Sequence, residues 1–279
     1  QTASKWSDLF SYNNVISIKD DGDRLIAATE NGIFYYYPNS GEVTKLSKAN
    51  GLHEVKISAF DYNTNTKIGI VGYQNGAMDI ITPEGIFLVV DIPIANGYLG
   101  NKKINHISIH DDKAIISVGY GVSIFDLNRR EFGDTAFFSN GGNYVNALEA
   151  TIINNKAYVS TANGILTHEI NTTFPVFTSW TTFASGNYKN IAAKDIIAIA
   201  TPNQVRFGAP EALNNLPQSF NNIKDVVITD DKIIVSDENR VFLFNKSGNL
   251  EKGINIWDNI NSATSFNNQI FTVAQCNGM

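Results

Sequence analysis

Several residue types are scarce in this 279-residue sequence, and each shortage narrows the possibilities. There is a single cysteine, Cys276, so no disulfide can form within the chain. No uninterrupted apolar run approaches the ~20 residues that a membrane-spanning helix requires, so we expect no transmembrane segment. Lysine and arginine (21) are outnumbered by aspartate and glutamate (27), which gives a net charge of −6. Because phosphate backbones attract basic surfaces, this balance argues against nucleic acid as a partner.

Motifs that carry chemistry are also missing. There are only four histidines. His106 and His110 are four residues apart in a predicted strand, and strand rise places them about 13 Å apart, too far for one metal ion. His53 and His168 have no acidic or thiol partner at ligand spacing. No phosphate-binding glycine loop and no Gly-x-Ser-x-Gly elbow occurs. We therefore predict no metal, no cofactor and no catalytic residue. Glu149, in a first strand, is the one acid that looks buried, and we expect it to point outward.

What the chain does contain is a repeated unit. It reads as an alternating strand, a tight polar turn, an aliphatic strand, an Asn-Gly-like turn, an aromatic-rich strand and a fourth strand. In the first unit the strands are expected at residues 15–18, 25–29, 33–37 and 43–46. Asparagine is abundant, with 35 residues, and suits such turns because it tolerates positive φ. Period-2 patterning broken by turn signals predicts an antiparallel all-β fold.

The spacing of this unit identifies the architecture. The second strand recurs at steps of 36 to 46 residues, around Ile26, Gly69, Ile115, Tyr158, Ile197, Ile233 and Ile270. Four strands in about 40–45 residues are typical of propeller blades. The sequence therefore predicts a seven-bladed β-propeller of four-stranded antiparallel blades, forming a single domain over residues 1–279.

The two ends of the sequence refine this prediction. Trp6–Phe10 resembles the segments that lead into the fifth and seventh units, and only two strands fit between residue 258 and Met279. We expect an incomplete last blade that is closed by the N-terminal strand, which leaves no gap with open strand edges. The chain would then be the N-terminal part of a longer multidomain protein. Its start, Gln1-Thr2-Ala3, fits a mature exported protein.

Candidate binding residues lie in the loops. Propellers usually bind partners through the loops of one face. Here the longest loops join the fourth strand of one blade to the first strand of the next. Exposed tyrosines suit sugars or polypeptides, and lysines suit phosphate or carboxylate. The candidate ligand-binding residues are Tyr98, Lys102, Lys103, Tyr144, Tyr188 and Lys189. An equally compatible interpretation is that these tyrosines cap blade junctions.

Three stretches carry a resemblance to a known family. They are Leu46–Leu52, the segment from Tyr62-Asn63 to Gly76–Ile81, and Gly121–Glu131 followed by Asp134-Thr135. These stretches resemble the N-terminal propeller of the PorZ family, a component of the Bacteroidetes type IX secretion system. The resemblance covers about residues 6–170. Asn50-Gly-Leu52 also resembles propeller repeats of two-component sensors.

The resemblance implies more than the residues themselves do. It implies a protein of two propellers and a C-terminal β-sandwich, located at the outer-membrane surface in a complex with PorU-, PorV- and PorQ-like proteins. It also implies a role in handling anionic lipopolysaccharide, a surface glycan. We accordingly expect a non-catalytic binding and scaffold propeller, exported to the outer-membrane surface or the periplasm.

Two other functions remain open. One is the extracytoplasmic sensor propeller of a two-component regulator. The other is a propeller glycan hydrolase or lyase, which would require several carboxylates that converge at one channel mouth.

Overall fold

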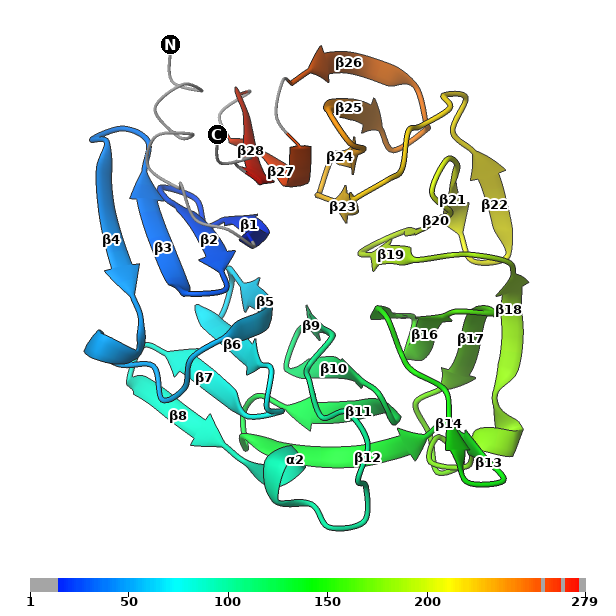
Figure 1. The fold of residues 1–279 in the computed structure, drawn as a ribbon. Helices are drawn as coiled ribbons and strands as arrows, with labels where there is room; N and C mark the ends of the chain where they lie inside the picture. The colour runs from blue at the N-terminus through cyan, green and yellow to red at the C-terminus, as the bar shows by residue number, and fades with distance from the viewer. Residues whose placement is uncertain (1–14, 257–258, 267–268, 276–279) are drawn as a thin grey trace.

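The computed structural model describes residues 15–256, 259–266 and 269–275, which form antiparallel sheets arranged in a ring around a common axis (Figure 1). Six of these sheets have four strands, which follow one another in chain order from the axis to the rim (Figure 1). Blades one to three are β1 (Val15–Asp20), β2 (Leu25–Thr29), β3 (Gly32–Tyr37) and β4 (Glu42–Leu46); β5 (Ile57–Asn63), β6 (Ile68–Tyr73), β7 (Met78–Thr82) and β8 (Gly85–Val89); and β9 (His106–His110), β10 (Lys113–Val118), β11 (Gly121–Asp126) and β12 (Glu131–Phe137). Blades four to six are β15 (Ala150–Ile153), β16 (Lys156–Thr161), β17 (Gly164–Glu169) and β18 (Thr181–Ser185); β19 (Asn190–Ala193), β20 (Ile197–Ala200), β21 (Val205–Ala209) and β22 (Ala212–Asn215); and β23 (Asp225–Ile228), β24 (Lys232–Ser236), β25 (Arg240–Asn245) and β26 (Leu250–Asn255).

A two-stranded hairpin occupies the space between blade six and blade one. It consists of β27 (Asn259–Phe266) and β28 (Gln269–Gln275), and β27 lies against both β1 and β24. The prediction of a seven-bladed propeller is therefore wrong: the described residues form six four-stranded blades and this hairpin. The prediction counted the two strands after residue 258 as an incomplete seventh blade, but among the described residues they form a hairpin with no third or fourth strand beside it. The expected closing strand, Trp6–Phe10, lies outside the described residues.

Local turn chemistry explains why the strands form hairpins where the sequence predicts them. Asn154 and Asn155 adopt φ values of 52° and 57° between β15 and β16, as a tight hairpin turn requires. Between β2 and β3, the Thr29 hydroxyl donates to the carbonyl oxygen of Gly32 (3.1 Å) and accepts from the Asn31 amide (3.2 Å). Thr161 repeats the first of these bonds to Gly164 in blade four. These turns thus fix the register of the central strands in blades one and four.

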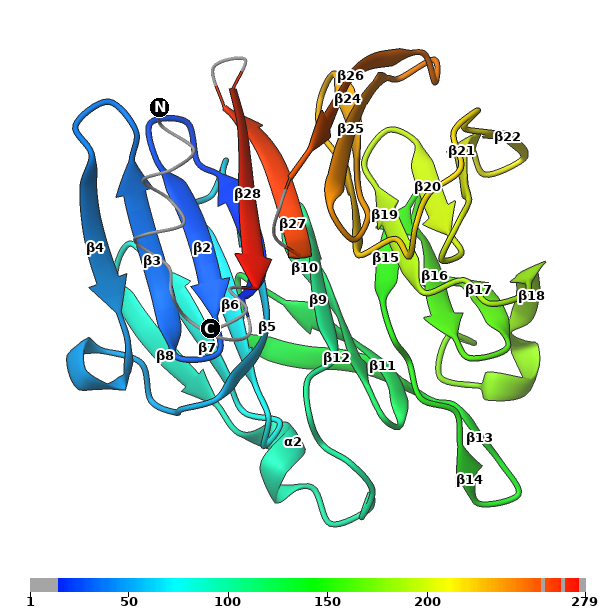
Figure 2. The same cartoon turned by 45° about the horizontal axis from the view of Figure 1, so that its top comes forward.

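Insertions in the ring gather on one side of it. A short helix, α2 (Asp91–Ile94), lies in the connection from β8 to β9, and a small hairpin, β13 (Ser139–Asn140) with β14 (Asn143–Tyr144), follows β12. Figure 2 shows that both project from the same face of the ring. Single 3-10 turns occur at Lys48–Asn50 and Phe177–Ser179. Within the described ranges, no helix has the length and apolar character needed to cross a membrane.

The core consists of apolar layers between neighbouring blades. Met78 and Ile80 of blade two pack with Ile116 and Phe125 of blade three, and all four side chains are fully buried. Blades five and six meet in the same way through a cluster of phenylalanines, Phe207, Phe220, Phe242 and Phe244. Each blade therefore buries both of its faces, and the close packing of these layers sets the angle between blades.

This packing predicts that the stability of the fold depends strongly on Gly72 of β6. A methyl group at this position would lie 2.6 Å from Cγ2 of Ile104, so Gly72→Ala overpacks the layer between blades two and three. We expect a loss of about 1–3 kcal/mol in the free energy of unfolding, measured by urea denaturation. The matched control is Gly133→Ala in β12, where the nearest atom to a new Cβ is 3.6 Å away. Equal stability of the two variants would contradict this account.

Candidate functional site

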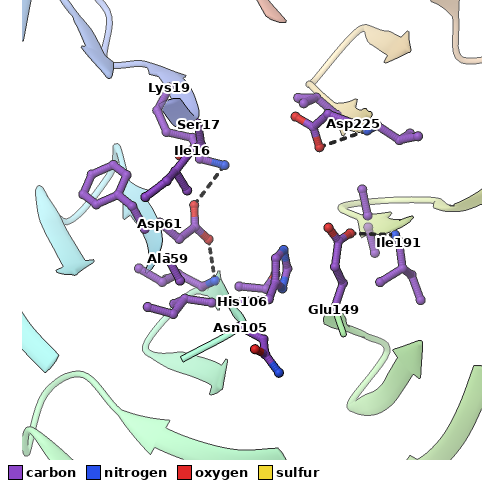
Figure 3. A pocket seen from close by; sticks show the side chains of 18 of the residues that line it. Ile16, Ser17, Lys19, Ala59, Asp61, Asn105, His106, Glu149, Ile191 and Asp225 are labelled. Carbon is purple, nitrogen blue, oxygen red and sulfur yellow. Dashed lines mark hydrogen bonds and ion pairs between the residues drawn. The ribbon is translucent and has the colours of Figure 1, made fainter. Parts of the chain in front are cut away.

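The first strands of the blades line a cavity of about 310 Å³ in the central channel (Figure 3). These strands are β1, β5, β9, β19 and β23, together with Glu149, which directly precedes β15. Their side chains bring ionisable groups from five blades to one place. The groups are Lys19, Asp61, His106, His110, Glu149, Lys224 and Asp225.

One wall of the cavity holds an ion pair. Nζ of Lys19 lies 3.2 Å from Oδ1 of Asp61, and the other oxygen of Asp61 accepts the backbone N–H of Ile109 at 2.6 Å. The negative charge of Asp61 raises the pKa of Lys19, against the opposing effect of burial. Asp61 thereby connects blades one, two and three.

The opposite wall holds two carboxyl groups. Glu149 accepts the backbone N–H of Ile191 (3.1 Å) and the side-chain amide of Asn190 (3.3 Å). Asp225 accepts the hydroxyl of Ser262 (2.6 Å) and its neighbour's N–H, that of Val226 (3.0 Å). Within the described part of the chain, neither carboxyl has a cation within ion-pair distance. Burial, and then the charge of Asp225, raise the pKa of Glu149 to about 8, and burial raises the pKa of Asp225.

The expectation that Glu149 points outward is wrong. Its side chain extends into the channel and bonds to β19 of the next blade. Alternation predicts the direction of side chains only within a strand, and Glu149 lies just before the first residue of β15. Its position between two blades could not be derived from the pattern of one blade.

The two channel histidines act as hydrogen-bond acceptors. His106 accepts the N–H of Ala150 (3.3 Å), and His110 accepts that of Ile152 (3.2 Å). A ring nitrogen accepts only when it carries no proton. Burial lowers the pKa of His106 to about 4 and also lowers that of His110, so both rings are neutral at pH 7. In the described ranges, no group of three or more His, Cys, Asp or Glu side chains is arranged to hold a metal ion.

These contacts form what we call the channel belt: bonds from a side chain at the channel side of one blade to the backbone of the next. Three of them, from Asp61, His110 and Glu149, connect successive blades from two to five. Asn190 extends the series by donating to the carbonyl oxygen of Lys224 (3.3 Å). No sequence pattern identified Lys19, Asp61 or Asp225 as site residues, since only the closed ring brings them together.

The predicted loop residues fall into two groups. Tyr98 is buried, with 6% of its surface exposed; its ring contacts Tyr144 edge-on at 4.9 Å, and its hydroxyl donates to the carbonyl of Asn101. Tyr144 is 41% exposed. The ammonium of Lys102 donates to the carbonyl oxygens of Pro93 (2.9 Å) and Ala95 (2.8 Å), and Lys103 is half-buried.

The second group lies at the junction of blades four and five. Tyr188 is buried, and its hydroxyl accepts from Arg206 at 3.4 Å. Lys189 is exposed. The structure thus brings Tyr98 and Tyr144 into contact but places Tyr188 and Lys189 at another junction, and a ligand-binding role for all six residues stays a prediction.

Fold and channel together define a β-propeller whose blades are joined by polar contacts around the axis. The sequence matches the family model described as "TSS9, PorZ, N-terminal beta-propeller domain" over residues 25–181. This match covers more than half of the chain. The chain therefore belongs to the PorZ N-terminal β-propeller family, whose members are components of the type IX secretion system.

Solved structures share the fold. PorZ from Porphyromonas gingivalis, described as an essential bacterial surface component of the type IX secretion system, has a TM-score of 0.77 at 14% identity over 95% of this chain. This chain spans 37% of the length of that protein. The WD40 repeats of RRP9 (TM-score 0.67, 11% identity, 90% of this chain and 83% of that one) and the WD40 propeller of Doa1 (0.67, 10%, 94% and 90%) are also similar. Among curated proteins, no sequence matches the chain.

The raised pKa of Glu149 predicts a pH-dependent stability. Because the native pKa of about 8 lies above the ordinary value of 4.5, native Glu149 keeps a proton that the unfolded chain releases. Its contribution to stability therefore falls as the pH rises toward 8. Between pH 6.5 and 8 we expect the free energy of unfolding of the wild type to fall by about 1–2 kcal/mol more than that of Glu149→Gln. Urea denaturation at several pH values measures this difference.

The pH window and the control matter for this measurement. The pKa of His106 is lowered from 6.5 to about 4 in the native protein, so its contribution to stability rises with pH. That change takes place below pH 6.5 and therefore outside the window of this measurement. The exposed Glu42→Gln variant should follow the wild type. Parallel pH profiles for wild type and Glu149→Gln would show that Glu149 is ionised in the native channel.

Proposed function

We propose that this chain is a non-catalytic binding and scaffold propeller of a type IX secretion attachment complex at the outer-membrane surface. The family match over residues 25–181 carries this proposal. The likeness to the P. gingivalis protein over 95% of the chain supports it, since that protein is described as a surface component of the system. The proposed partners are PorU-, PorV- and PorQ-like proteins.

The channel supports a structural rather than a catalytic role. Asp61, Glu149 and Asp225 do converge there, as the glycan hydrolase or lyase alternative requires. Each of these carboxyls already accepts hydrogen bonds from a blade backbone or a neighbouring hydroxyl. A catalytic acid or base must instead reach a proton of the substrate. The family match favours secretion over the two-component sensor.

A pull-down tests the scaffold proposal. The tagged chain, incubated with detergent-solubilised outer membranes of its source bacterium, should recover PorU-, PorV- or PorQ-like proteins identified by mass spectrometry. The WD40 propeller of Doa1, which shares the fold at 10% identity, is the control for non-specific retention by a propeller. Recovery of none of these proteins, or equal recovery on both propellers, would count against the proposal.

We further propose that the chain handles anionic lipopolysaccharide through its loop lysines. Lys103 and Lys189 are the residues to change, because Lys102 is bonded to Pro93 and Ala95 and its loss would disturb the loop. Each substitution to glutamine should weaken binding to immobilised anionic lipopolysaccharide by a factor of about five, since a lysine near an anionic surface contributes about 1 kcal/mol. Lys252→Gln on the outer strand β26 is the control. Unchanged affinity of Lys103→Gln and Lys189→Gln would remove these residues from the site.

A further inference from the structure

A second cavity, of about 180 Å³, lies between α2 and blade three, and we call it the blade-three pocket. Ile92 and Ala95 form its wall on the helix side. Four aromatic side chains, Tyr98, Tyr120, Phe132 and Phe137, form most of the remaining wall, and the polar side chains of Asp91, Ser123 and Thr135 also line it. No residue of this pocket lines the channel cavity.

The aromatic walls are held in place by one another. The ring of Tyr120 contacts Tyr98 at 5.3 Å and Phe137 at 5.1 Å, and Tyr144 contacts Tyr98 from outside the pocket. Tyr98 and Tyr120 are almost fully buried, at 6% and 5% exposure. Lys102 fixes the opposite wall through its bonds to the carbonyls of Pro93 and Ala95. The pocket is therefore preformed, and a ligand entering it would not have to order these residues.

The size of the pocket matches one aromatic ring. A dry, apolar cavity of about 150 Å³ in another protein binds benzene, and the blade-three pocket is slightly larger. A ligand pocket that is mostly apolar also needs a few polar groups to orient its occupant.

Three hydroxyl groups supply that polar element. Tyr120 bonds to Ser123 (2.5 Å), and Ser123 bonds to Thr135 (2.7 Å), with Ser123 and Thr135 both in the pocket lining. The three hydroxyl groups carry three protons, and the two hydrogen bonds among them use two of these. One proton and several oxygen lone pairs therefore remain available to hydrogen-bond a ligand. An aromatic ring with a polar edge, indole or phenol, complements this arrangement better than a plain phenyl ring.

Apolar surface continues outside the pocket. Among the described residues, nine large hydrophobic side chains are exposed, and six of them lie between residues 88 and 144. Ile94 (68% exposed) and Leu99 (92%) flank the loop that lines the pocket, and Phe137 and Tyr144 lie at its edge. Figure 2 shows α2, its loop and the β13–β14 hairpin on the same face of the ring. Exposed apolar patches of this kind mark surfaces that bind other proteins.

We propose that the blade-three pocket binds a tryptophan or tyrosine side chain of a partner polypeptide, whose flanking apolar residues cover Ile94 and Leu99. A free small aromatic molecule would fill the pocket but leave those two side chains in water. A glycan would need more hydrogen-bonding groups than one chain of hydroxyls and the carboxylate of Asp91 provide. The choice of a polypeptide rests on the proposed scaffold function; the aromatic specificity rests on the pocket alone. Asp91 at the pocket lining favours a basic residue next to the aromatic one.

The test uses a blocked peptide, Ac-Gly-Leu-Trp-Lys-Leu-Gly-NH2, its analogue with alanine in place of tryptophan, and the blocked amino acid N-acetyl-tryptophanamide. Binding to the purified chain is followed by NMR titration and calorimetry. The tryptophan peptide should shift the resonances of Tyr98, Tyr120 and Phe137. It should bind at least about tenfold more tightly than the alanine peptide, as expected for an aromatic anchor in a buried pocket. It should also bind more tightly than N-acetyl-tryptophanamide, because only the peptide covers Ile94 and Leu99.

Variants locate the binding site. Ala95→Trp, at an exposed lining position, should fill the pocket and abolish binding, and Phe137→Ala should weaken it about fivefold or more. Thr135→Val should reduce the preference for tryptophan over phenylalanine in the same peptide. Val176→Ala, which removes an exposed hydrophobic side chain after blade four's third strand, is the matched control and should bind normally.

Several results would overturn the proposal. They are equal binding of the tryptophan and alanine peptides, shifts of the same resonances by glucose or mannose instead of the peptide, and equal affinity of the peptide and N-acetyl-tryptophanamide. A pull-down that recovers no secretion proteins, with peptide binding intact, would refute the scaffold function and leave the aromatic specificity standing.

Discussion

Strand pairing in the described blades stays within each sheet, so no hydrogen-bond ladder joins one blade to the next. Apart from single backbone bonds, such as that from the N–H of Ile57 to the carbonyl oxygen of Glu30 (2.9 Å), side chains hold the ring together. At mid-blade, apolar layers such as that of Met78 and Phe125 do this. At the axis the first strands surround a cavity, and polar side chains connect the blades there. Asp61, His110 and Glu149 each accept a backbone N–H from the following blade, which satisfies donors that no strand partner reaches. The apolar layers and the channel belt together hold neighbouring blades in place.

Burial in the channel determines the ionisation of the histidines and of Glu149 in the channel belt. His106 and His110 can accept hydrogen bonds only as neutral rings, and burial keeps them neutral. Glu149 keeps its proton because it is buried near Asp225, whereas Asp61 is paired with Lys19. Shifted pKa values often mark catalytic sites, but structural networks shift them as well. Here burial in the channel accounts for the shifts, and the hydrogen bonds from Ile191 and Asn190 act against the raised pKa of Glu149, so the perturbed groups do not by themselves indicate an enzyme.

Local features of the fold could be predicted from the sequence, and features that depend on ring closure could not. The first-unit strands were predicted because turn chemistry and alternation act over a few residues. The number of blades was wrong because the two strands after residue 258 were counted as a seventh blade completed by the N-terminal strand, whereas among the described residues they form only a hairpin. The channel site was missed because Lys19 and Asp225 are about 200 positions apart and lie in one cavity only after the ring forms. The burial of Tyr98 was not apparent either, since the loop that carries it packs back onto Tyr120 of blade three.

The same physics explains why binding would take place at the rim rather than at the axis. The polar groups of the channel are largely used by the protein itself, and a ligand there would have to compete with bonds that hold the blades together. The blade-three pocket lies outside that network, between blade three and the loop that Lys102 holds in place. A ligand in this pocket would therefore disturb no contact between the first strands of neighbouring blades. Its exposed surroundings, Ile94 and Leu99, cost free energy in water as long as nothing covers them. In the proposed scaffold function, the rigid ring would fix where the partner is held, and the exposed apolar side chains of this loop would decide which partner it is.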